Sequence, residues 1–169
     1  MPRKALRKTV ARSQNAPAKK PQQVPPPGEG KRGEQGYLAY LLRQAQAATR
    51  LAMERSLAEL GVTSPQFVVL TMLKAYPGLS GADLARVAML TPQTVGVIIR
   101  NLERDGAIRK TPHPVHGRVL QWRVTPRGAA LLARCRRHAR AVERRLAAGL
   151  SAQAQRTIRR WLARIATDL

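Results

Sequence analysis

The sequence predicts a mainly α-helical fold with a small β-wing, in which a winged helix-turn-helix unit lies between long N- and C-terminal helices. Three observations predict it. A strongly amphipathic helix opens at Thr91. A basic segment with the two-residue period of β-strands follows it over residues 107–124. Helical hydrophobic periodicity extends over residues 37–60 and 127–149. We place the unit itself at about residues 64–126.

Residues 1–36 differ in composition from the rest of the chain. They hold nine Lys or Arg, six of the twelve prolines and two acids, Glu29 and Glu34. So little apolar surface cannot offset the entropy cost of ordering, and we predict a disordered basic, Pro-rich N-terminal arm. The arm either adds contacts to DNA phosphates or is a solvated tail. One domain, residues 37–169, is then long enough for a modest core.

The first helix of the winged unit has a marked start and stop. Ser64 followed by Pro65 opens it, and Pro77–Gly78 ends it. Ser80 can then cap a short helix at residues 81–87, which leads into the helix opened by Thr91 with helix-turn-helix spacing. The core-facing side of the first of these helices is predicted to be Phe67, Leu70, Thr71 and Leu73.

The helix that opens at Thr91 is the most informative element. Thr91 can accept a backbone N–H bond as N-cap, and Pro92 loses nothing at the first helical position. One face carries an apolar stripe that must be buried, formed by Val95, Ile98, Ile99 and Leu102. The opposite face combines amides, hydroxyls, a small residue and cations, which suits the bases and phosphates of a major groove. Its residues are Gln93, Thr94, Gly96, Val97, Arg100, Asn101 and Arg104.

A β-hairpin is predicted once Asp105–Gly106 end this helix. Its first strand, residues 107–111, carries Lys110, and its second, residues 119–124, alternates apolar with polar side chains. Arg118 lies near the tip of this wing. The residues predicted to contact DNA from the helix and the wing are Thr91, Gln93, Thr94, Val97, Arg100, Asn101, Arg104, Lys110 and Arg118.

The charge of the chain points to a polyanionic partner. The formal net charge is +22, from 31 Lys or Arg and 9 Asp or Glu. A general compositional bias toward Arg and Ala is the alternative explanation for part of this excess. No apolar run is long enough to span a bilayer, and the basic N-terminus lacks the apolar core of a signal peptide, so we expect a cytoplasmic protein.

Cysteine and histidine offer little chemistry. The single Cys135 excludes an internal disulfide, and its position on a helical apolar stripe favours packing, although neighbouring arginines leave an oxidant sensor open. His113 and His116 have no acid or cysteine nearby to complete a metal site. The sequence holds no metalloprotease motif, P-loop or nucleophile elbow. We therefore predict neither a metal, nor a cofactor, nor enzymatic activity.

The sequence resembles the MarR family of winged helix-turn-helix regulators over residues 36–169. The resemblance rests on the segments SPQFVVLTML, LSGADLARVAMLTPQTVGVIIRNLERDGAIRK and GRVLQWRVTPRGAALL. In that family the first and last helices interdigitate between chains. The resemblance therefore implies an obligate homodimer, with dimerisation helices at about residues 37–60 and 127–169. The last helix, capped by Ser151, is expected to bear Ile158, Trp161, Leu162 and Ile165.

The wing departs from the family in one respect. Family members usually carry an acidic wing motif resembling Asp-x-x-Asp-x-Arg, whereas His113 and His116 occupy the acidic positions here and Arg118 is retained. The resemblance thus keeps a minor-groove role for Arg118 but not the ion pair that would hold it. Protonated histidines would repel that arginine. Either the wing is sensitive to pH, or the two histidines are exposed residues without functional effect.

The resemblance also implies a small-molecule effector. In the family, small anionic and often aromatic compounds enter a cleft beside the dimerisation helices and change the separation of the recognition helices. An aromatic acid or an acyl-CoA thioester is expected here, with Arg43 as anion partner and Tyr40 and Phe67 as aromatic walls. Alternatively, Arg43 and Arg50 lie on the solvent face of their helix. The matching residues are Tyr40, Arg43, Gln44, Ala47, Arg50, Phe67, Leu70 and Thr71.

Sequence and resemblance together predict a dimeric transcriptional repressor that binds a pseudo-palindromic operator and releases it when the effector binds. Two alternatives stay open. In the first, the chain is a sequence-tolerant architectural DNA binder in which the basic arm and wing provide most of the DNA contacts. In the second, it is a repressor that senses oxidants through Cys135. The ratio of specific to nonspecific affinity separates a regulator from an architectural protein.

Overall fold

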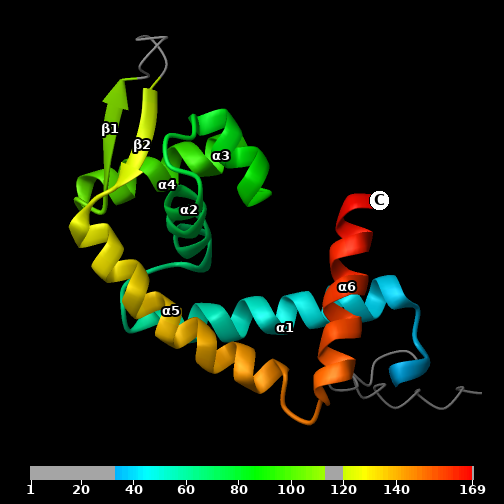
Figure 1. Ribbon diagram of the computed structural model, residues 1–169. Coiled ribbons are helices and arrows are strands. Elements are labelled where there is room, and N and C mark those ends of the chain that lie inside the picture. The colour runs from blue at the N-terminus through cyan, green and yellow to red at the C-terminus, as the bar shows by residue number, and fades with distance from the viewer. Residues whose placement is uncertain (1–32, 113–119, 169) are drawn as a thin grey trace, which may run out of the picture.

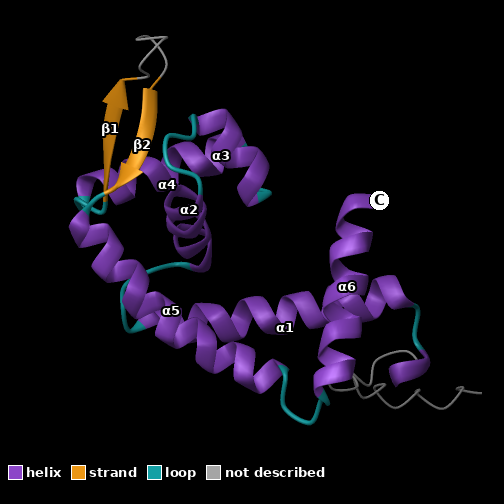
Figure 2. Cartoon of the chain, viewed as in Figure 1, coloured by secondary structure: helices purple, strands orange, loops and turns teal. Residues whose placement is uncertain are grey.

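The computed structural model describes residues 33–112 and 120–168. Its elements are a 3-10 turn η1 (Gly33–Gln35), α1 (Leu38–Ala58), α2 (Ser64–Ala75), α3 (Gly81–Ala88), α4 (Pro92–Arg104), β1 (Ile108–Pro112), β2 (Leu120–Val124), α5 (Pro126–Leu146) and α6 (Ala152–Asp168). The predicted fold class is confirmed, with helices predominating and one antiparallel β-hairpin (Figure 2). The expectations for the N-terminal arm up to residue 32, for His113 and His116, and for Arg118 lie outside the described residues.

The elements form two parts that share α5. Helices α2, α3 and α4 gather with the hairpin as the winged unit, α1 and α5 pack together below it, and α6 follows α5 at the C-terminal end of the chain (Figure 1). In the hairpin, Ile108 pairs with Val124 and Lys110 pairs with Trp122. Helix α5 starts directly after β2, so it connects the wing with the second part of the molecule, which is formed by α1, α5 and α6.

Side-chain caps fix where the helices begin. Thr91, Ser80 and Ser151 each accept a backbone N–H from the residue three positions on, as predicted. Helix α2 begins at Ser64, but its cap is Thr63, which forms a reciprocal capping box with Gln66. From the sequence, the start of this helix was assigned to Ser64 and Pro65, and the capping box formed by Thr63 and Gln66 was not recognised.

The main core lies inside the winged unit. The predicted stripe of α4 is buried, with Val95, Ile98, Ile99 and Leu102 between 1% and 6% exposed. It packs against Leu70 and Leu73 of α2, Leu84 of α3, Ile108 of β1 and Leu132 of α5. Val69 of α2 is also fully buried, although the periodicity had not singled it out. A second cluster joins Leu57, Val62 and Cys135 where α1 meets α5.

The winged unit is joined to α5 by a tight contact. The hydroxyl of Thr125 donates to the carbonyl oxygens of Gly106, at 2.7 Å, and of Ala107, at 3.1 Å, and it accepts the Gly128 N–H at 3.0 Å. Gly128 lies against the Ala107 carbonyl so closely that a Cβ built on it would overlap the oxygen. This contact between α5 and the end of α4, which we call the joint, therefore requires glycine.

Within residues 33–112 and 120–168, no single helix is long and apolar enough to cross a membrane. Only α3 and α4 taken together reach that length and apolar content, and they are bent by 110° relative to each other.

The joint yields a prediction about stability. Gly128→Ala should lower the free energy of unfolding by about 3 kcal/mol, because the added methyl meets backbone that cannot rotate away. Gly96→Ala is the matched control. Its methyl would make an ordinary 3.6 Å contact with Arg100, so this variant should gain about 0.5–1 kcal/mol from helix propensity. Urea unfolding of both variants checks the pair, and equal effects would contradict the close contact.

Candidate nucleic-acid interface

The face of α4 opposite its buried stripe is open to solvent. Gln93, Thr94, Val97, Arg100 and Arg104 are exposed, and Asn101 is half-buried. Val97 is an apolar side chain that remains 49% exposed. Because α4 buries the other half of its surface, it presents this face as a rigid unit. An exposed helix with mixed amide, apolar and guanidinium groups can contact base edges and phosphates in a major groove.

The first turn of α4 is held by its own threonines. The Thr91 hydroxyl accepts the Thr94 N–H at 3.1 Å, and the two hydroxyl oxygens lie 2.8 Å apart. Thr91 thus acts mainly as the cap, and Thr94 keeps one further hydrogen bond for a partner. This fixes the orientation of the end of α4 that carries Gln93.

Two of the predicted DNA-contacting cations have acidic partners. Lys110 of the wing pairs with Glu103 at 3.2 Å, and Arg104 pairs with Asp105 at 3.0 Å. Such exposed pairs add little stability but limit where the cations point. Arg100 forms no ion pair with any acid in the described part of the chain. It is therefore the most available guanidinium on the exposed face of α4.

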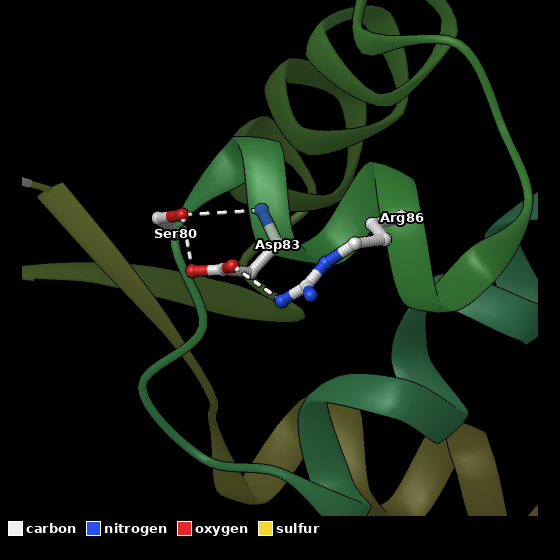
Figure 3. Close-up of polar contacts among 3 residues, drawn as sticks. All are labelled: Ser80, Asp83 and Arg86. Atoms are coloured by element: carbon white, nitrogen blue, oxygen red, sulfur yellow. Dashed lines mark hydrogen bonds and ion pairs between the residues drawn. The ribbon is translucent and has the colours of Figure 1, made fainter.

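A small network at the start of α3 was missed in the sequence. The Ser80 hydroxyl donates to Asp83 Oδ2 at 2.7 Å and accepts the Asp83 N–H at 3.2 Å, while Arg86 Nη2 donates to Asp83 Oδ1 at 3.0 Å (Figure 3). The hydrogen bond from Ser80, followed by the hydrogen bond and charge of Arg86, lowers the pKa of Asp83 below its ordinary value of 3.8. The Ser-x-x-Asp spacing was the signal that could have found this network.

The structure does not bring together all the residues predicted to hold an effector. On α1, Gln44 donates to the Tyr40 hydroxyl at 3.2 Å, Arg50 pairs with Glu54 at 2.7 Å, and Arg43 and Ala47 are exposed. On α2, Leu70 is fully buried in the core, and Thr71 donates to the Phe67 carbonyl at 2.8 Å. The pairing of Arg50 with a neighbour on its own helix agrees with the alternative in which this arginine faces solvent.

A cleft nevertheless lies beside α1, α2 and α5. It measures about 350 Å³, and Phe67 is the only residue of the predicted set that lines it. We call it the inner cleft; its lining includes Thr49, Met53, Phe67, Arg136, Arg140 and Glu143, and the Glu143 carboxylate is paired with Arg159 of α6 at 2.6 Å. Arg136 and Arg140 belong to α5, which the sequence interpretation had not considered as a source of anion partners. The inner cleft thus combines an apolar wall with guanidinium groups.

Cys135 is fully buried beside Leu57 and Val62. Burial raises the pKa of its thiol, which disfavours the reactive thiolate. Both observations agree with the interpretation of Cys135 as a packing residue.

The family of this chain is identified by its similarity to known proteins. The model of the MarR family matches residues 62–120. An HTH-type transcriptional repressor of Mycobacterium tuberculosis, Rv2887, is 40% identical over 131 residues, which are 78% of this chain and 94% of that protein. The chain belongs to the MarR family. The resemblance stated from the sequence is confirmed, and it places the winged unit of this MarR-family member among DNA-binding folds.

Two crystal structures of Rv2887 match this MarR-family chain along most of its length. The complex with salicylic acid has a TM-score of 0.65 and 39% identity, and it covers 78% of this chain and 98% of that one. The complex with DNA has the same TM-score and 38% identity, with 78% and 99% covered. A relative with the same fold has therefore been observed with DNA and with an aromatic acid.

The Ser80 network predicts a pH-dependent contribution to stability. Since the folded-state pKa of Asp83 is lowered, its contribution is present above about pH 3.8 and is lost as the pH falls through the folded-state pKa. Asp83→Asn should therefore lower the melting temperature at pH 7, and its difference from the wild type should vanish in acid. Ser80→Ala is the control background: there, the same substitution should cost less. A difference that stays constant with pH would contradict the assignment.

Proposed function

We propose that this chain is a homodimeric, sequence-specific DNA-binding transcriptional repressor whose operator is released when a small anionic effector binds. The observation that carries this proposal is the exposed face of α4, which is held by a fully buried stripe and flanked by a basic wing. The net charge of +22 adds a general attraction to DNA. The complex of Rv2887 with DNA supports DNA binding by this fold.

Base reading is assigned to the exposed face of α4 from its first turn to Arg100. Gln93 and Arg100 can each form paired hydrogen bonds to a base edge, and Val97 can contact a thymine methyl group. Lys110 and Arg104 lie at the margins, where they suit phosphates. Thr91, Thr94 and Asn101 complete the proposed surface, together with Arg118 of the wing.

A second copy of the chain is the proposed partner of α6. Among the described residues, α6 buries none of its side chains, and Ile158 and Leu162 are 39% and 41% exposed. On α1, Gln44 has a buried Oε1 without a hydrogen-bond partner in the described part of one chain. A second copy could cover the apolar face of α6 and supply the missing donor. Two chains would then place two copies of α4 on one pseudo-palindrome.

The inner cleft is the proposed effector site. Its apolar wall with Arg136 and Arg140 suits an aromatic acid, and the complex of Rv2887 with salicylic acid supports this class. An acyl-CoA thioester is the second candidate effector; Arg43, the cation expected for its phosphates, is exposed on α1 and does not line the cleft. Because the cleft touches α1, α2 and α5, a ligand that prefers one arrangement of these helices shifts α4 with them. The proposed role is binding and release, without catalysis.

Two other functions predict different observations. An architectural DNA binder would show little preference among sequences. In an oxidant switch, Cys135→Ser would abolish the release of DNA that peroxide induces. The burial and raised pKa of the Cys135 thiol disfavour this function. The exposed amides and Val97 of α4 favour the sequence-specific function, since phosphate contacts alone need none of them.

Selection of bound fragments from a random DNA library at about 150 mM salt tests the proposed function. We expect one palindromic motif bound at least about 10³-fold more tightly than bulk DNA. Gln93→Ala and Arg100→Ala should each cost about 1–3 kcal/mol and relax preference at one position of each half-site. Arg137→Ala, an exposed arginine on α5, is the control and should leave the motif unchanged. Recovery of unrelated fragments would instead support the architectural function.

The assembly is tested separately. Ile158→Glu with Leu162→Glu should weaken self-association by on the order of 100-fold, because two apolar side chains proposed to be buried between the chains become charged. Sedimentation velocity measures the change, and circular dichroism checks that the helices persist. Arg160→Glu, on the opposite side of α6, is the control. A dimer that survives the double substitution would show that α6 pairs through another face.

A further inference from the structure

A second groove lies on the outer side of the winged unit. It occupies about 420 Å³ between the turn that joins α1 to α2, the end of α4 and the first turns of α5. We call it the outer groove and define it by Val62, Gln66, Leu102, Leu131, Arg127 and Arg134. It shares no lining residue with the inner cleft. The N-terminal part of α5, which contributes to its lining, is drawn in yellow in Figure 1.

The charge of the outer groove favours an anion. Arg127 and Arg134 are seven positions apart on α5, two helical turns, and therefore project from the same side. Neither forms an ion pair with an acid in residues 33–112 or 120–168. Asp105 also lines the groove, but its carboxylate is held by Arg104 at 3.0 Å. Two guanidinium groups are thus left for a ligand.

The base of the outer groove is apolar. Leu131 and Leu60 are only partly buried against the hydrophobic clusters and leave apolar surface facing the groove, whereas Leu102 and Val62 are just 2% and 6% exposed. An inorganic ion would leave this surface uncovered. A ligand with a flat or aliphatic body and a carboxylate at one end would cover the leucines and reach the arginines, and the Gln66 side chain offers a further polar group at the rim.

The position of the groove suggests what a ligand would do there. Its wall includes Ala107, whose carbonyl oxygen accepts from Thr125 in the joint between α4 and α5. A ligand that bridges Arg127 of α5, Gln66 of α2 and Leu102 of α4 would restrain the angle at which α4 leaves that joint. None of the defining residues belongs to α6, the helix proposed above to pair with a second copy of the chain.

We propose that the outer groove is a second binding site for a small organic carboxylate, separate from the inner cleft and coupled to the placement of α4. The coupling to DNA rests on the proposed function, whereas the binding itself does not. The coupling is reciprocal. If the ligand changes the affinity for the operator by some factor, the operator changes the affinity for the ligand by the same factor.

Amide-resolved NMR with salicylate as the probe tests the site. Titration of the full chain to about 10 mM should shift the amides of Val62, Leu102, Ala107 and Leu131. Arg127→Gln with Arg134→Gln should weaken this response about tenfold or more, since two charge-assisted hydrogen bonds are lost. Arg136→Gln with Arg140→Gln is the matched control: it removes the same charge from the same helix, at the inner cleft, and should leave the response of the outer groove intact.

Other outcomes would overturn the proposal. Shifts confined to residues of the inner cleft would do so, as would an outer-groove response that the Arg127 and Arg134 substitutions leave unchanged. If inorganic phosphate shifts these amides as strongly as salicylate does, the groove is a general anion site and the proposal of an organic carboxylate is wrong. Without salicylate, the Arg127 and Arg134 variant should keep the operator preference of the wild type. That preference also separates the two proposals, because its absence from the wild type would refute the proposed function and leave the binding result standing.

Discussion

The burial of one face of α4 is the constraint on which the rest of the structure depends. Val95, Ile98, Ile99 and Leu102 remove their apolar surface from water against α2, α3, β1 and α5, and each such side chain contributes about 1.5–3 kcal/mol. Because this stripe fixes the rotation of α4 about its axis, the remaining face must point outward. A polar helix face becomes a reading surface only when its orientation is set in this way.

The joint between α4 and α5 transmits that orientation to the rest of the chain. Thr125 ties the backbone after α4 to the start of α5, and Gly128 allows the two to approach more closely than any side chain would permit. Helix α5 then packs along α1 and carries the arginines of both the inner cleft and the outer groove. A change in the packing of α1 against α5 can therefore reach α4 through this short connection, as the proposed release of DNA by an effector would require.

The net charge and the groups exposed on α4 have different roles in the proposed recognition of DNA. The large excess of arginine and lysine attracts any polyanion and makes association strongly salt-dependent. In the proposed function, preference among sequences comes from a few uncharged or precisely held groups on α4, because phosphates are the same at every site. Ion pairs such as that between Glu103 and Lys110 reduce the freedom of cations near this surface without neutralising its overall potential.

Local sequence determined much of this molecule. The caps at Ser80, Thr91 and Ser151 and the apolar stripe of α4 follow from short-range spacing, since capping and helical periodicity involve residues only a few positions apart. Family resemblance supplied the architecture around them. Only the tertiary structure decided which arginines line a cleft: Arg136 and Arg140 do, whereas Arg50 pairs with Glu54 on its own helix. Many arginines on α1 and α5 have the same local pattern, and their surroundings are set by how the two helices cross, which depends on contacts between residues far apart in the chain.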